Sequence, residues 1–200
     1  MRFFPVFLLF ILFFACSPSE NTTEEKNDTT KNAENGSEAT EESTTSDENT
    51  LLDSPYLISK GTFFGVNIGD NLDALKKDKP DSFREDVVET GEGSFDVVKI
   101  LDENGDALAD IHFQSEENNV NLVEIYSEKA FTIDGLKIGK SFKDILKIYP
   151  DALPHGSEIE GQVNVEADGI YYRLDERNTS YDIDLESFNK DAKITAIILQ

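Results

Sequence analysis

The sequence is short of cysteine, tryptophan and positive charge, and each shortage excludes a class of protein. Its single cysteine rules out an intramolecular disulfide. Lysine and arginine number 18 against 41 aspartates and glutamates, so the formal net charge is -23. Such a charge repels nucleic acid and anionic lipid head groups, and we therefore expect no nucleic-acid partner. Without tryptophan, the core must be built from 14 phenylalanines, 6 tyrosines and aliphatic residues.

The chain also lacks a hydrophobic run long enough to cross a bilayer as a helix. Its apolar N-terminal run, residues 3–14, is far shorter than the roughly 20 residues that a span needs, and it has the length of a signal-peptide core. The run ends at Ala15 and Cys16, which resembles a bacterial lipobox. This resemblance implies a lipoprotein signal peptide at 1–15 and acylation of Cys16. An ordinary secretory signal or an uncleaved anchor is the alternative. Ser17 is not an aspartate of the retention type, which favours the outer membrane.

Residues 16–50 have the composition of a tether. Beyond Cys16 they are mostly Ser, Thr, Asn and Glu, with ten acidic residues against two lysines. Such a segment buries too little apolar surface to offset the entropy of ordering it, and its charges repel one another. We expect a disordered, extended linker that connects lipidated Cys16 to a single domain at 51–200.

That domain contains an internal repeat. Residues 62–81 and 132–151 share seven identities in twenty positions at a constant offset of 70. Each copy opens with a Gly-x-x-Ile-Gly turn and continues into a short helix, and the two repeats extend over about 56–127 and 128–200. Both helices have polar residues at their starts that can cap them, and each is followed by a proline.

Three strand-like segments follow each predicted helix. Their apolar residues alternate with polar ones, which is typical of a sheet with one buried and one solvated face. The predicted fold class is therefore α+β: tandem duplicated helix-plus-three-strand units that share one antiparallel sheet, with the helices on one face. The predicted strands are residues 95–101, 107–113 and 120–126 in the first unit, and 170–175, 181–186 and 193–199 in the second.

Three stretches of the second unit, residues 135–145, 155–161 and 193–198, together resemble the RpoE-regulated lipoprotein family. The resemblance covers most of 56–200 and implies an envelope lipoprotein of unknown molecular function. More distantly, the repeated unit is similar to β-lactamase-inhibitor-protein and outer-membrane-assembly-lipoprotein architectures, which implies a binding protein. The family supplies no functional residue to transfer.

Two motifs with possible ligand chemistry are better explained as turns. The Gly-x-x-Ile-Gly motif at 65–69 lacks the spacing of a phosphate-binding loop. The acidic stretch 102–106 starts like a calcium loop, but Phe113 stands where a bidentate glutamate is required. We predict a strand-to-helix turn and a hairpin loop, respectively, and no cofactor or metal site. His112 shares strand parity with polar neighbours, which predicts a solvated histidine on the polar sheet face.

The strongest candidate site is the loop that carries His155, Ser157, Glu158 and Glu160. A His/Glu pair could bind a metal or move a proton, although a metal site usually needs a third protein ligand. A solvated acidic loop is the alternative. No serine lies in a nucleophile elbow. We therefore expect an outer-membrane-anchored binding or envelope-maintenance protein with an envelope protein or glycan partner. An inhibitor of an exported hydrolase, or a metal-dependent or hydrolytic enzyme that uses the His155 loop, are the alternatives.

Overall fold

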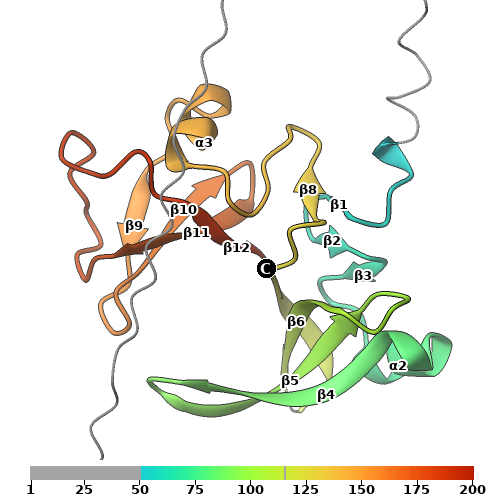
Figure 1. The fold of residues 1–200 in the computed structure, drawn as a ribbon. Helices are drawn as coiled ribbons and strands as arrows, with labels where there is room; N and C mark the ends of the chain where they lie inside the picture. The colour runs from blue at the N-terminus through green and yellow to red at the C-terminus, as the bar shows by residue number, and fades with distance from the viewer. Residues whose placement is uncertain (1–50, 115) are drawn as a thin grey trace, which may run out of the picture. The chain divides into compact units, whose positions relative to one another are not determined.

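The computed structural model describes residues 51–114 and 116–200 (Figure 1). The predicted signal peptide, lipidated Cys16 and the tether lie outside these residues and remain predictions. In the described part of the chain, no helix is long and apolar enough to cross a membrane.

The described residues form mainly one eight-stranded antiparallel sheet, with the strand order β4-β5-β6-β7-β12-β11-β10-β9. Strands β7 and β12 are neighbours at its centre and join an early and a late group of four strands (Figure 1). The strands of this sheet are β4 (Phe83–Thr90), β5 (Gly93–Leu101), β6 (Ala107–Gln114), β7 (Asn119–Ile125), β9 (Pro154–Gly156), β10 (Gln162–Ala167), β11 (Ile170–Arg177) and β12 (Ile194–Leu199).

Shorter elements complete the fold. Two small two-stranded sheets pair β1 with β8 in parallel and β2 with β3 in antiparallel orientation. Their bounds are β1 (Leu57–Ile58), β8 (Phe131–Thr132), β2 (Thr62–Phe63) and β3 (Val66–Asn67), and the helical elements are α2 (Leu72–Asp78), a 3-10 turn (Pro80–Ser82) and α3 (Phe142–Ile148).

The predicted α+β class is wrong. The two α-helices have only seven residues each, whereas the eight-stranded sheet dominates the described chain. The units predicted as one helix plus three strands are also wrong, because four sheet strands follow each helix. The short helices reflect their sequences: each stops within two residues of a proline, Pro80 or Pro150, that cannot continue it.

Two segments account for most of the error. Strand β4 is an edge strand whose residues are exposed or half-buried, so no alternation of buried and polar residues marks it in the sequence. The predicted strand 181–186 alternates but forms no strand. There the Asp184 carboxylate accepts the backbone N–H of Glu186 at 3.1 Å, a local bond that competes with strand pairing.

The helix starts follow the sequence closely. The Asn71 side chain caps α2 by accepting the Ala74 N–H at 3.1 Å. Ser141 and Asp144 form a complete capping box at α3. The Ser141 hydroxyl also donates to the Asp144 carboxylate at 2.7 Å. The bond from Lys147 and the bonds from Ser141 keep the pKa of Asp144 far below its usual value. Each cap ties its helix to the sheet, since Asn71 and Ser141 form isolated bridges to Asn119 and Lys193.

The core lies on one face of the eight-stranded sheet. Buried side chains of the strands, such as Ile111, Val123 and Ile197, pack there with Leu72 of α2 and Phe142 of α3. The opposite face carries the alternate residues of the same strands and no helix from the described chain packs on it. This second face holds the candidate functional site.

Candidate functional site

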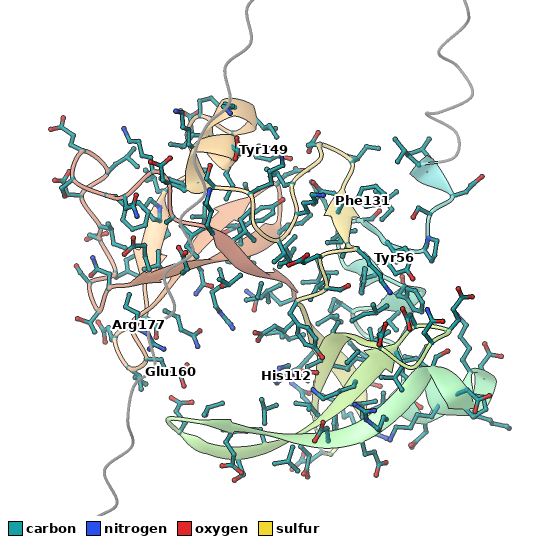
Figure 2. All side chains as sticks on the ribbon, in the orientation of Figure 1. Tyr56, His112, Phe131, Tyr149, Glu160 and Arg177 are labelled. Atoms are coloured by element: carbon teal, nitrogen blue, oxygen red, sulfur yellow. The ribbon has the colours of Figure 1, made fainter. Side chains whose placement is uncertain are left out.

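The sheet curves so strongly that elements near its two edges meet across the second face. The backbone N–H of Gly91, at the tip of the β4–β5 hairpin, donates to the Glu160 carboxylate at 3.3 Å. Glu160 lies in the loop between β9 and β10, at the other edge of the sheet. Figure 2 shows Glu160 beside the hairpin tip and His112 on the strands between the two edges. The face between them is therefore concave.

Two adjoining concavities of about 420 Å³ each occupy this face. Leu122, Ser157 and Arg173 line both of them, so we treat them as one groove. Exposed apolar side chains stand at its rim, including Ile159, which is 74% exposed, and Phe95, which is 43% exposed. The groove thus combines apolar walls with a polar floor built on the sheet.

A buried ion pair lies at one end of the groove floor. Asp110 is only 8% exposed and accepts hydrogen bonds from Lys99 at 2.8 Å and from the Tyr126 hydroxyl at 3.0 Å. Burial lowers the pKa of Lys99, but its bond to Asp110 outweighs this and leaves the pKa above the usual value. Burial and the negative charge of Asp110 raise the pKa of Tyr126 to about 12. Lys99 and Tyr126 therefore both keep their protons at neutral pH.

Arg173 forms the second ion pair of the floor. Its guanidinium contacts the Glu124 carboxylate across the intervening strand β12. The Arg173 Nε–H is enclosed but donates no hydrogen bond, and the Asn164 side-chain oxygen is enclosed but accepts none. Asn164 and Arg173 are cross-strand partners on β10 and β11. The unpaired donor and the unpaired acceptor therefore belong to paired residues of neighbouring strands, and a buried polar atom without a partner costs about 1–3 kcal/mol.

Two of the four predicted site residues line the groove at its β9 end. His155 is half-buried on β9, with its ring stacked on Tyr181 at a centroid distance of 4.5 Å and its Nδ1 3.1 Å from the Tyr181 carbonyl oxygen. Ser157 lines both concavities. Its hydroxyl accepts the backbone N–H of Glu160 at 3.4 Å, so it also closes its own loop.

The two predicted glutamates have different positions. Glu160 lines the groove and holds the loop together through Gln162 and the hairpin tip. Glu158 is exposed and does not line the groove. Within residues 51–114 and 116–200, no three histidine, cysteine or acidic side chains are grouped so that they could hold a metal ion. The His155/Glu158 pair, considered above as a site that could bind a metal or move a proton, therefore finds no third metal ligand among these residues.

The remaining predicted features have structural explanations. The Asp102 carboxylate in the hairpin loop accepts hydrogen bonds from Lys129, at 2.6 Å, and from the backbone N–H groups of Asn104 and Asp106. These donors lower the pKa of Asp102 and hold the loop as a closed turn. His112 is half-buried and lines the groove.

Sequence reasoning missed the central groove residues. Asp110, Glu124 and Arg173 lie on different strands, and the Arg173–Glu124 contact joins residues 49 apart. Each of them alternates with core residues along its strand, as Asp110 does between Ala109 and Ile111, and this pattern predicts an ordinary solvated face. No local signal in the sequence therefore marks these charges as paired across the groove.

No family model matches the chain, and no curated protein sequence matches it. Among solved structures, the crystal structure of the uncharacterized protein YfeY from Escherichia coli is similar to it at 15% sequence identity, covering 59% of this chain and 80% of that one. The TM-score is 0.40, which supports no argument about the function of this chain.

Proposed function

We propose that this chain is a lipoprotein of the outer membrane, anchored through Cys16, that binds an envelope protein or glycan in the groove. The anchor rests on the sequence of the leader and the tether, and on the resemblance to the RpoE-regulated lipoprotein family. The binding role rests on one observation: the sheet face opposite the core is concave and combines exposed apolar side chains with charges that are already paired with each other. Exposed apolar groups rimmed by polar ones are typical of an interaction surface.

Paired charges favour binding over proton transfer. The Asp110 carboxylate already accepts bonds from Lys99 and Tyr126, and Glu124 is paired with Arg173. A general base needs a lone pair that can reach substrate. The lone pairs of these carboxylates are instead occupied by Lys99, Tyr126 and Arg173. These bonds fix the side chains of the groove floor in place, as a preorganised binding surface requires.

In-cell photo-crosslinking tests this proposal. A photo-reactive amino acid in place of Ile159, in the groove and 74% exposed, is expected to capture an envelope component. The same amino acid in place of Ile133, outside the groove and 62% exposed, is the matched control and is expected to capture none. Cys16→Ser is expected to release the chain from the membrane fraction and to abolish capture.

Equal capture at both positions would contradict a binding role for the groove. A Cys16→Ser chain that stays in the membrane fraction would contradict the anchor. The two parts of the proposal are therefore tested separately in one experiment.

A further inference from the structure

We infer that the outer edge of β4 binds an extended, basic segment of a partner protein by adding it to the sheet as a further strand. This surface lies beside the groove, and the inference does not rest on what the groove binds. β4 is the last strand of the eight-stranded sheet, so only one of its two sides is paired, with β5 (Figure 1). The N–H and C=O groups on its other side have no strand partner in the described chain and form a template for an incoming strand.

The two edges of the sheet differ in how well they are protected. β9, at the other edge, has three residues and is tied to the segment that follows β11, because the Gly156 N–H donates to the Ser180 carbonyl at 3.1 Å. β4 has eight residues, pairs with β5 in one register without a bulge, and contains no proline. Short edge strands, bulges and prolines commonly block strand addition, and β4 has none of these.

The backbone of Val87 shows that the open edge has donors to offer. Its N–H donates to the side chain of the preceding Asp86 at 2.9 Å and therefore points away from β5. Because the direction of the N–H groups alternates along an antiparallel strand, those of Glu85 and Glu89 point the same way. A carbonyl group of an added strand can replace the Asp86 carboxylate at Val87 and continue the pairing on both sides of it.

A concavity of about 410 Å³ beside the middle of β4 can receive a side chain of the added strand. Its lining includes Val87, which is 52% exposed, buried Val98 and half-buried Phe113. The register of β4 on β5 places Val87 and Val98 on the same face of the sheet. Alternate side chains of an added strand also point to this face, so one apolar side chain can enter the concavity.

The charges along this edge select the partner. Four of the eight residues of β4 are charged, three of them acidic, and the whole chain carries a net charge of -23. Glu89 of β4 and Asp96 of β5 contact no cation in the described part of the chain. An acidic edge repels a second copy of this chain and attracts a basic segment. The fitting partner therefore carries lysine or arginine beside the apolar residue that enters the concavity.

The peptide Thr-Lys-Thr-Val-Thr-Lys-Thr, acetylated and amidated at its ends, tests the inference. Its valine and lysines share one face of an extended strand, so pairing the valine with Val87 places the lysines opposite Glu85 and Glu89. The full-length protein labelled with ¹⁵N is titrated with this peptide and followed by NMR. We expect saturable shifts, largest for the amides of β4, with a dissociation constant on the order of 1 mM or below. Shifts that do not saturate, or that are largest away from β4, would overturn the inference.

Two methylated forms of the peptide separate strand pairing from charge attraction. A methyl group on the valine nitrogen removes the donor that faces β4, whereas one on the following threonine nitrogen removes a donor that faces away. Both forms keep the charge of the peptide. We expect the first to bind about tenfold more weakly, and the second to change the affinity less than about threefold. Equal affinity of the two forms would show attraction without strand pairing and would refute the inference.

Two protein variants locate the pairing. Val87→Pro removes the outward N–H, and an edge strand tolerates proline at a position whose N–H faces solvent. It is expected to weaken binding about tenfold, whereas Val87→Ala, which keeps the N–H, is expected to weaken it less than about threefold. Val87→Pro that binds the peptide as tightly as the wild-type protein would contradict strand addition at β4. If this variant does not fold, the comparison of the two methylated peptides on the wild-type protein decides.

Discussion

Gly156 is the position where one added methyl group should cost the most. A Cβ atom there would run into the backbone carbonyl oxygen of Asn178 and would lie 2.5 Å from that of Ser180. The Gly156 N–H also donates to the Ser180 carbonyl at 3.1 Å, so the two backbones are tied together where they cross. Both neighbours are backbone atoms, which cannot move aside by changing a rotamer.

The expected cost of Gly156→Ala follows from these contacts. Overpacking a tight site costs about 1–3 kcal/mol, and loss of the bond to Ser180 adds about 1 kcal/mol. We therefore expect the free energy of unfolding to fall by about 2–4 kcal/mol. For a domain of this size that lowers the melting temperature by roughly 5–15 °C. Thermal unfolding of the purified protein, followed by circular dichroism, measures the shift.

Gly91→Ala is the matched control. A Cβ at Gly91 would have the Glu160 carboxylate as its nearest neighbour, at 3.6 Å, which is an ordinary contact. The control is expected to change the free energy of unfolding by less than about 0.5 kcal/mol. If Gly156→Ala melts with the wild-type protein, or if both variants fall equally, the close crossing at Gly156 is not what holds this edge of the groove.

Two further predictions concern the helix cap and the groove floor. Ser141→Ala removes the capping box of α3 and should lower the free energy of unfolding by about 1 kcal/mol, seen as a lower urea midpoint with an unchanged slope. The pKa of Tyr126 is about 12 in the folded protein and near 10 when unfolded, so the folded state holds its proton longer as the pH rises. Its contribution is complete below pH 10 and is lost as the pH rises to 12; it amounts to about 1 kcal/mol once solvent screening is allowed for. Tyr126→Phe should remove this part of the alkaline destabilisation in urea titrations at pH 9 and pH 12, and an unchanged pH dependence would contradict the buried bond to Asp110.

The sequence predicts local structure better than it predicts the sheet. The predicted strands at 95–101, 107–113 and 120–126 coincide with β5, β6 and β7, because alternation and a hairpin loop are properties of neighbouring residues. Strand β4 has no buried residue, so nothing in its sequence distinguishes it from a charged loop. At 181–186 apolar and charged residues do alternate, and Ile183 and Leu185 pack partly on the core. Hydrogen bonds to the Asp184 side chain, however, hold this backbone in turns instead of a strand.

The sequence also predicts only part of the candidate site, because it shows which residues are neighbours along the chain but not which strands lie side by side. His155 and Ser157 are close in sequence, and a local reading brings them together. The pairing of Asp110 with Lys99 spans 11 residues, and that of Glu124 with Arg173 spans 49. The second pairing depends on β12 lying between β7 and β11, a strand order that alternation does not encode. A sequence can therefore show that a strand face is charged without showing which of its charges meet.

The paired charges hold the floor of the groove. Both carboxylates of the floor are paired with a cation, buried Asp110 with Lys99 and half-buried Glu124 with Arg173. The only enclosed side-chain atoms without a partner in the described chain are the uncharged Asn164 oxygen and the Nε–H of Arg173. Atoms that water cannot reach are also closed to a ligand, so these two atoms do not select what binds. Recognition in the groove depends instead on the exposed side chains at its rim, such as Phe95 and Ile159.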